Sequence, residues 1–328
     1  MKKLALISAM AVAVAMLAGS ANAADPLKLQ LKWSADAQFA GYYVAAAKGF
    51  YKDANLDVTI LPGGPNVAPE QVIAGGGADV IVDWMAAALV AREKGVPLVN
   101  IAQPFVKGGL QLTCWKSSNV ATPADLKGKT LGVWFYGNEY PFFAYMSKLG
   151  IKATGDNPDV KVLQQAFNVD PLLQHQADCI STMSYNEYLQ ILESGVKADD
   201  LVVFKYADQG AAMLEDGLYT TEDKLKDPAW QDRLARFVKA SMQGWDYAQK
   251  NPAEAVKIVE SNDPTGAISD AHETGMMAEI NKLTAGSTGA LDPAAYKTTV
   301  DMLLAQKIIT AEPTGATTTA VTDAAGLK

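Results

Sequence analysis

Short apolar segments alternate with helical stretches along most of this chain, and that alternation is typical of parallel β-sheets wrapped by helices in an α/β fold. A first series ends near residue 102, and a second begins after the glycine-rich stretch at 105–109. We therefore expect two sheet units. The predicted strands are 27–33, 56–61, 79–82 and 98–102 in the first unit, and 110–115, 130–134, 160–163, 178–183 and 201–204 in the second.

The last third of the chain is mainly helical in pattern. Two α/β lobes joined by two crossings form a clamp, in which the ligand lies in the cleft and closure is a hinge motion. We expect the late helices to pack on the first lobe, and the Ala-, Thr- and Gly-rich tail at 313–328 to be loosely ordered. The predicted late helices are 230–249, 252–260, 270–284 and 293–306.

Residues 1–23 have the three parts of a secretory signal peptide. Lys2 and Lys3 form a positive start, residues 4–17 are nearly all apolar, and Ala21-Asn22-Ala23 has the small-x-small form that signal peptidase cuts. A membrane anchor is the alternative reading. That apolar run is shorter than the roughly 20 residues that span a bilayer, so we expect a cleaved signal.

Export determines the expected environment of the protein. Ser20 stands where a lipoprotein would carry cysteine, so we expect a periplasmic protein without a lipid anchor. Cys114 and Cys179 are the only cysteines; they either form a disulfide in that oxidising compartment or remain two buried thiols. The net charge of −8 argues against nucleic acid as a partner.

Candidate ligand contacts lie in four loops, each leading from a predicted strand into a predicted helix. In parallel sheets such loops converge on the crevice at the carboxyl ends of the strands. All four loops combine aromatic with amide or carboxylate side chains. The candidates are Trp33, Gln38 and Tyr42; Asp83 and Trp84; Trp134, Tyr136, Asn138 and Glu139; and Tyr185, Asn186 and Glu187.

This mixture suits a flat, nitrogen-rich ring. Aromatic faces offer rigid stacking surfaces, and a carboxylate can accept two parallel hydrogen bonds from an aminopyrimidine edge. The three arginines, Arg92, Arg233 and Arg236, lie outside these loops, which argues against an anion held by a guanidinium. Helix N-terminal amides remain an alternative anion site. Taken singly, Asp83 and Asn138 also fit the role of helix caps.

Catalytic and metal-binding motifs are nearly absent from the sequence. His175 and His272, the only histidines, each fall on a predicted polar helix face without metal-ligand spacing. Gly75-Gly76-Gly77 leads into a strand, so it indicates a turn rather than a dinucleotide fingerprint. Glu215 and Asp216 fit the cleft and the solvent equally well. We expect a binding protein that has no cofactor and is not an enzyme.

Several motifs spread over the chain identify a family resemblance. They are Leu31-Lys32-Trp33, Gln38-Phe39-Ala40-Gly41-Tyr42-Tyr43-Val44-Ala45, Lys48-Gly49-Phe50-Tyr51, Leu126-Lys127-Gly128-Lys129, Gly132-Val133-Trp134, Gly137-Asn138-Glu139 and Tyr185-Asn186-Glu187. Together they resemble the solute-binding proteins of ABC importers. The most similar branch binds thiamine pyrimidine precursors or riboflavin, within the nitrate, sulfonate and taurine superfamily.

The resemblance implies a type II periplasmic binding fold with a two-strand hinge, in which residues 24–106 and 209–328 form lobe 1 and residues 107–208 form lobe 2. It implies a monomer that delivers a hydroxymethyl- or formylamino-pyrimidine to a membrane permease driven by an ATPase. The implied roles are a ring sandwich of Trp33, Tyr42 and Trp134, with the ring edge contacted by Asp83, Glu139 and Asn186.

Other functions fit the same resemblance. Riboflavin or an alkyl sulfonate would use the same cleft, and a sensory binding module would pass its signal to a receptor instead of a permease. The fold also resembles the eukaryotic synthase that makes the thiamine pyrimidine at a cysteine-rich iron site. This chain departs from that enzyme, because it has two cysteines and two histidines and neither histidine lies in a cleft motif.

Overall fold

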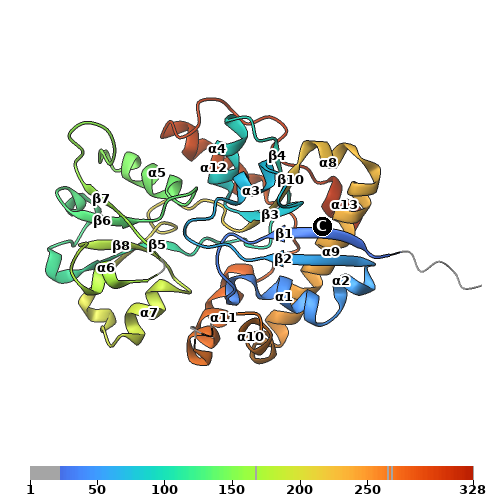
Figure 1. Cartoon of the computed structure of the whole chain (residues 1–328). Coiled ribbons are helices and arrows are strands. Elements are labelled where there is room, and N and C mark those ends of the chain that lie inside the picture. The colour runs from blue at the N-terminus through green and yellow to red at the C-terminus, as the bar shows by residue number, and fades with distance from the viewer. Residues whose placement is uncertain (1–22, 167, 264–265, 267–268, 328) are drawn as a thin grey trace, which may run out of the picture.

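Two five-stranded sheets lie side by side in the computed structural model, which describes residues 23–327 apart from 167, 264–265 and 267–268 (Figure 1). The expected signal peptide lies outside the described residues except for Ala23. The first sheet has the order β2 (Leu56–Leu61), β1 (Asp25–Gln30), β3 (Val80–Asp83), β10 (Gly217–Thr221) and β4 (Leu98–Ala102). The second has the order β7 (Lys161–Gln164), β6 (Thr130–Val133), β8 (Cys179–Met183), β5 (Leu110–Trp115) and β9 (Leu201–Lys205).

The expected α/β class with two sheet units is confirmed, but the sheets are mixed rather than parallel. β10 runs antiparallel to β3 and β4, and β5 runs antiparallel to β8 and β9. Each reversed strand is the first that the chain forms after it crosses between the sheets. Each of these two strands begins beside a crossing, whereas the strands next to it end there. Its direction is therefore opposite to theirs. The short strand β10 was missing from the sequence prediction.

The two crossings, 103–109 and 206–216, are hydrogen-bonded to each other. The carboxylate of Glu215 accepts hydrogen bonds from the backbone N–H groups of Gly109 and Leu110, at 2.8 and 3.0 Å. The side-chain amide of Gln103 donates to the carbonyl oxygen of Glu215. Both crossings lie outside the ten strands of the described residues. The hinge that they form is therefore not regular β-structure.

Helices cover both sheets, and one close helix pair positions the first candidate loop. α1 (Ala40–Ala47) lies against α9 (Pro228–Lys250), and glycines make the approach possible. A Cβ atom on Gly41 would lie 2.3 Å from the ring of Trp245, and one on Gly244 would lie 2.0 Å from the carbonyl oxygen of Gly41. Larger side chains would separate the helices and shift the loop that precedes α1.

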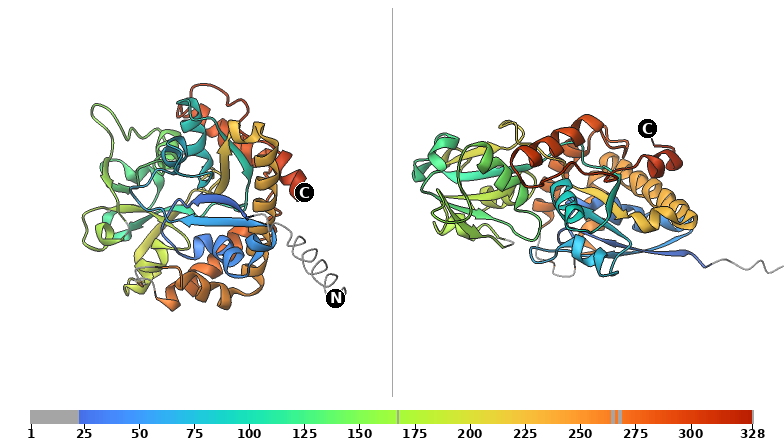
Figure 2. Two further views of the ribbon diagram at one scale, coloured as in Figure 1. Left: turned by 45° about the vertical axis from the view of Figure 1, so that its right-hand side comes forward. Right: turned by 90° about the horizontal axis from the view of Figure 1, so that it is seen from above.

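The remaining helices are short or moderate in length, and none in the described part of the chain is both long and apolar enough to cross a membrane. Figure 2 shows the late helices gathered around the first sheet. Besides α1 and α9, the α-helices of the described residues are α2 (Phe50–Asp53), α3 (Pro69–Ala74), α4 (Met85–Glu93), α5 (Tyr140–Lys148), α6 (Asp170–Leu173), α7 (Glu187–Glu193), α8 (Glu222–Lys226), α10 (Pro252–Glu260), α11 (Asp270–Thr284), α12 (Pro293–Ala305) and α13 (Ala320–Ala325).

The expectation of a loosely ordered tail at 313–328 is wrong for its described part. Thr317 bridges to Asn100 beside β4, and α13 packs on α9 (Figure 2). Val321 is only 2% exposed there. The small side chains of this segment, which suggested that it had little to bury, allow its backbone to approach the helix closely.

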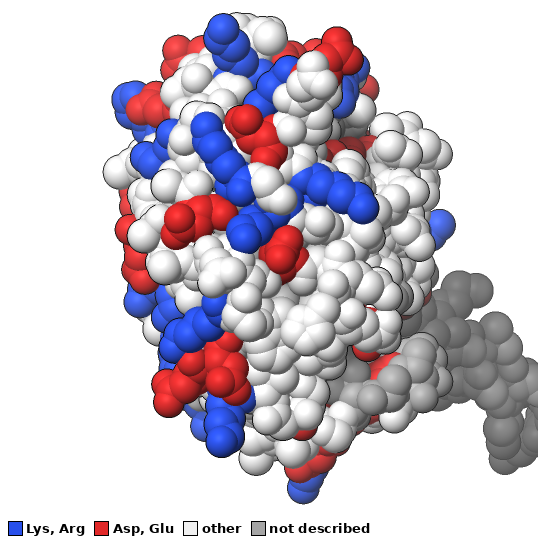
Figure 3. All heavy atoms as spheres, turned by 90° about the vertical axis from the view of Figure 1, so that its left-hand side faces the viewer, with Lys and Arg blue, Asp and Glu red and all other residues white. Residues whose placement is uncertain are grey.

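Charged side chains of both signs are interspersed on the face formed by the second sheet and its helices (Figure 3). Acidic side chains lie beside the basic ones, so no single sign of charge covers this face.

Cys114 and Cys179 form a disulfide. The two residues lie opposite each other in the β5–β8 pair, and their side chains are fully buried. Of the two possibilities that the sequence left open, the structure therefore shows the disulfide.

The disulfide is expected to stabilise the second unit. It joins positions 65 residues apart, and a loop of that length corresponds to about 4 kcal/mol in the chain-entropy account. Replacing both Cys114 and Cys179 by valine should therefore lower the free energy of urea unfolding by about 2–4 kcal/mol. The unreduced, denatured protein should contain no titratable thiol, and one or two free thiols per chain would contradict the assignment.

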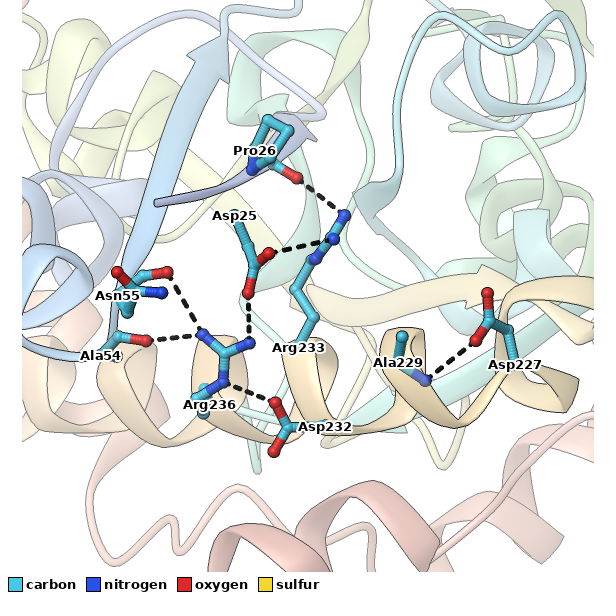
Figure 4. Close-up of polar contacts among 9 residues, drawn as sticks. All are labelled: Asp25, Pro26, Ala54, Asn55, Asp227, Ala229, Asp232, Arg233 and Arg236. Atoms are coloured by element: carbon cyan, nitrogen blue, oxygen red, sulfur yellow. Dashed lines mark hydrogen bonds and ion pairs between the residues drawn. The ribbon is translucent and has the colours of Figure 1, made fainter. Parts of the chain in front are cut away.

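Two arginines fasten the start of β1 to α9 (Figure 4). Nη2 of Arg236 donates to the Asp25 carboxylate at 2.6 Å, and Nη2 of Arg233 donates to it at 3.3 Å. Nη1 of Arg236 also donates to the carbonyl oxygen of Ala54, just before β2. These bonds tie the edge strand β2 and its neighbour β1 to one helix, and the bonds from Arg236 are the main cause that lowers the pKa of Asp25.

Asp25→Asn is expected to reduce stability by about 1 kcal/mol or less, because the partly exposed carboxylate is screened by water. A lowered folded-state pKa means that this contribution is present above about pH 4 and lost as the pH falls further. Urea unfolding at pH 7 and pH 3 measures both effects. Asp232→Asn, which removes only a helix-surface pair with Arg236, is the control and should change stability less.

Candidate functional site

A pocket lies between the two sheet units, where loops at the ends of β1, β3, β6 and β8 face one another. It encloses about 300 Å³, counting its open mouth. Eight of the twelve predicted site residues line it, together with Lys32 and Met183. The first unit contributes Lys32, Trp33, Gln38 and Trp84, and the second contributes Trp134, Asn138, Met183, Tyr185, Asn186 and Glu187.

Aromatic side chains from both units form the walls of this pocket. The indole rings of Trp33 and Trp134 meet edge to face, with centroids 5.9 Å apart and planes at 66°. Nε1 of Trp134 donates to the carbonyl oxygen of Ala166 at 3.0 Å, which fixes the ring. Nζ of Lys32 lies 5.2 Å from the centroid of the Trp84 ring. The pocket therefore has flat, rigid surfaces on both sides of the hinge.

The side-chain amides that line the pocket are oriented by partners behind it. Nε2 of Gln38 donates to Oδ2 of Asp216 at 2.6 Å, and Nε1 of Trp84 donates to Oδ1 of the same carboxylate at 2.9 Å. Nδ2 of Asn138 donates to the carbonyl oxygen of Phe135 at 2.9 Å. Because these bonds use the amide nitrogens, Gln38 and Asn138 offer their oxygen atoms to the pocket as acceptors.

Buried carboxyl groups surround the pocket. Glu187 is 1% exposed and accepts a hydrogen bond from the backbone N–H of Met183 at 2.9 Å; burial raises its pKa to about 7. Burial likewise raises the pKa of Asp216 to about 6, although the bond from Gln38 opposes the shift. The pKa of Asp36 is raised well above its usual value, first by burial and then by the nearby charge of Glu273.

The positive charge nearest these carboxyl groups is already paired. Lys32 is 2% exposed, and its Nζ lies 2.6 Å from Oδ1 of Asp83, which is fully buried. Oδ1 also accepts a hydrogen bond from the backbone N–H of Trp84 at 2.8 Å. The polar groups that remain available to a ligand in this pocket are therefore mainly hydrogen-bond acceptors.

Four predicted site residues lie outside the pocket lining, which corrects part of the predicted set. Tyr42 is 1% exposed and packs edge to face on Trp245 in the core, with ring centroids 5.6 Å apart, so it takes no part in a ring sandwich. Asp83 lies beneath the pocket, paired with Lys32. Tyr136 is 43% exposed. Glu139 is half-buried and accepts a hydrogen bond from the backbone N–H of Gly137 at 2.9 Å, so it stabilises its own loop.

Three residues of the site were not predicted from the sequence. Lys32 lies inside the motif Leu31-Lys32-Trp33 but was not among the predicted site residues. Met183 ends a buried strand and carries no polar signal. Asp216 was left open between cleft and solvent; it is 1% exposed and holds Gln38 and Trp84. Within the described residues, no group of three or more His, Cys, Asp or Glu side chains is placed to hold a metal ion.

The unliganded protein is expected to lose stability as the pH rises from about 5 to 8. Glu187, Asp216 and Glu215 have folded-state pKa values of about 7, 6 and 8, whereas unfolded carboxyl groups titrate near pH 4. The folded state therefore binds more protons in this window, and the free energy of unfolding falls as they dissociate. Urea unfolding at several pH values measures the slope.

Glu187→Gln should make that slope shallower, because it removes one of the groups that release a proton. Asp246→Asn changes a carboxylate on the surface of α9 and should leave the slope as it is. A stability that stays constant or rises between pH 5 and 8 would show that these carboxyl groups are ionised in the folded protein.

Comparison with known proteins gives the family of the chain. The family model described as NMT1/THI5 like matches residues 36–255. A formylaminopyrimidine-binding protein of Halalkalibacterium halodurans is 23% identical over 243 residues, covering 74% of this chain and 72% of that protein. A 4-amino-5-hydroxymethyl-2-methylpyrimidine phosphate synthase of Candida albicans is 28% identical over 244 residues, covering 69% of this chain and 68% of the enzyme.

The architecture also recurs in solved structures. A Candida albicans protein described as having the generic periplasmic binding protein fold superposes with a TM-score of 0.64 at 17% identity, covering 92% of this chain and 94% of that one. At this identity the similarity shows the fold alone. Since the family model spans well over half of the sequence and every pocket loop after Trp33, the chain belongs to the NMT1/THI5-like family, with the periplasmic binding protein fold.

Proposed function

We propose that this protein binds a small planar nitrogen heterocycle in the periplasm, a thiamine pyrimidine precursor such as a hydroxymethyl- or formylamino-pyrimidine, and delivers it to an ABC permease. The observation that carries the proposal is a pocket with aromatic walls from two units and polar atoms that mainly accept hydrogen bonds. The name of the Halalkalibacterium halodurans relative supports the same class of ligand.

The acceptors suit the edge of an aminopyrimidine. An exocyclic amino group has two N–H donors, which the amide oxygens of Gln38 and Asn138 can accept from opposite units. Glu187 can accept a further bond, which becomes charge-assisted if a ring nitrogen is protonated. The tryptophans then stack on the ring faces. The proposed contacts with the ring edge and the ring faces therefore come from both units.

The size of the pocket favours one ring over a fused system. The rings of Trp33 and Trp134 already meet across the boundary, with centroids 5.9 Å apart, so little width is left between the two units. The three fused rings and ribityl chain of riboflavin would need the two units to stand further apart. Riboflavin is therefore the second candidate.

An alkyl sulfonate fits less well, because the pocket offers little to an anion. Arg92 bonds to Glu222, and Arg233 and Arg236 bond to Asp25, so all three guanidinium groups are committed elsewhere. Lys32 is neutralised by Asp83. Glu187 and Asp216 repel a sulfonate once the pH is high enough to ionise them.

We propose further that the chain is a monomeric binding protein without catalytic activity. The relative from Candida albicans is an enzyme, so the family includes both kinds of protein. Here the two cysteines are joined in a disulfide inside the second unit, away from the pocket lining.

The proposed lobes are residues 24–106 with 209–328, and residues 107–208. We propose that they rotate about the crossings at 103–109 and 206–216 and close on the ligand. The edge-to-face contact between Trp33 and Trp134 joins the two lobes, so this arrangement corresponds to the closed form. Opening would separate these two rings.

Isothermal titration with 4-amino-5-hydroxymethyl-2-methylpyrimidine, riboflavin and an alkanesulfonate tests the proposal. We expect the pyrimidine to bind most tightly. Trp134→Ala should weaken that binding by about 5- to 150-fold, because stacking a base on an aromatic ring is worth about 1–3 kcal/mol. Trp230→Ala is the control, since that indole packs beside Lys224 and Arg233 on the surface of α8 and α9.

Two results would contradict the proposal. If the alkanesulfonate binds and the pyrimidine does not, the acceptor-rich reading of the pocket is wrong. If Trp134→Ala and Trp230→Ala bind the pyrimidine as tightly as the unmodified protein, the ligand lies outside the aromatic walls.

A further inference from the structure

His272 lies in a different environment from the polar helix face that its sequence pattern predicts. It is in the first turn of α11, where its backbone N–H donates to the capping hydroxyl of Ser269 at 3.2 Å. The side chain is 5% exposed and faces α7 of the other sheet unit. A buried imidazole thus stands at the boundary between the two units, outside the pocket lining described above.

Both ring nitrogens of His272 face acceptors in the second unit. Nδ1 lies 2.9 and 3.1 Å from the carboxylate oxygens of Glu193, and Nε2 lies 3.0 Å from Oδ1 of Asn186. An amide oxygen only accepts hydrogen bonds, so Nε2 carries the proton wherever it bonds to Asn186. Through these two bonds, α11 of the first unit reaches across the boundary to α7 and to a residue that lines the pocket.

The bond to Asn186 determines which end of its amide the pocket receives. Oδ1 of Asn186 accepts from Nε2 of His272 and also from Nε2 of Gln190, at 3.0 and 2.8 Å. With its oxygen held by two donors, Asn186 presents its amide nitrogen to the pocket. Since Gln38 and Asn138 present oxygens, Asn186 supplies a donor in a pocket otherwise rich in acceptors.

We propose that His272 is a positioning residue, which holds Asn186 as a hydrogen-bond donor to an acceptor atom of the ligand and links the two units in the closed form. In a pyrimidine, the unprotonated ring nitrogen is such an atom. The inference rests on the proposed function for the identity of the ligand. The contact between the units does not depend on that identity.

The decisive experiment compares substitutions of His272 in the full chain, with 4-amino-5-hydroxymethyl-2-methylpyrimidine as the probe. His272→Phe keeps a ring of similar size and removes both donors, and it should dissociate from the probe about tenfold faster, the scale of one hydrogen bond. His272→Gln keeps a donor for Asn186 and should stay within about threefold of the unmodified protein. His175→Gln changes the exposed histidine and should have no effect.

Histidine ring NMR makes the inference testable without a ligand. With only two histidines in the chain, a ¹⁵N spectrum of the unliganded protein separates His272 from the control His175. In the closed form, His272 should show a protonated, slowly exchanging Nε2, and Glu193→Ala should perturb its Nδ1 signal. An Nε2 that carries no proton either with or without the probe would overturn the proposal.

The two proposals fail in different ways. If the unmodified protein does not bind the pyrimidine, the proposed function is wrong, while the ring spectrum still decides whether His272 bridges the units. If the unmodified protein binds it and His272→Phe releases it at the same rate, His272 is not a positioning residue although the ligand is correct.

Discussion

The placement of the two sheets relative to each other depends on the buried carboxyl group of Glu215. Removing a carboxyl group from water is costly unless hydrogen bonds replace the lost solvent. The backbone N–H groups of Gly109 and Leu110 supply those bonds and thereby hold one crossing against the other. The ends of the strands in both sheets face each other because these two crossings are held together. The pocket, the aromatic contact between the units and the reach of α11 to α7 follow from that alignment.

Buried ionisable side chains extend from the hinge to the pocket. Asp216, next in the chain to Glu215, receives hydrogen bonds from Gln38 and Trp84, so the same crossing that joins the units also orients two pocket side chains. Lys32 and Asp83 compensate each other at 2.6 Å. Burial raises the pKa of Glu187 to about 7 and that of Asp216 to about 6, so each is more easily protonated than an exposed carboxyl group, which lowers the cost of leaving it buried.

Periodicity and loop composition anticipated most of the architecture but only part of the site. Nine strands and the long late helices could be recognised because the apolar pattern repeats along the whole length of each element. β10 could not, since five residues that begin with glycine carry little pattern. Tyr42 and Trp33 looked equivalent in sequence. The close approach of α1 and α9 turns Tyr42 onto Trp245, whereas Trp33 meets Trp134 across the boundary. Such choices depend on contacts between distant segments, which no local pattern contains.

Both described ends of the chain are fastened to the same helix. Asp25 is bound by Arg233 and Arg236, and α13 packs on α9 near the other end of the sequence. Figure 1 shows β1 entering and α13 ending on the side of the first sheet that is remote from the second. A carrier protein or a solid support attached at either terminus would therefore sit away from the mouth of the pocket. The molecule is therefore suited to immobilisation as a sensor with α9 as the fixed base, since attachment there leaves the proposed movement of the two units unhindered.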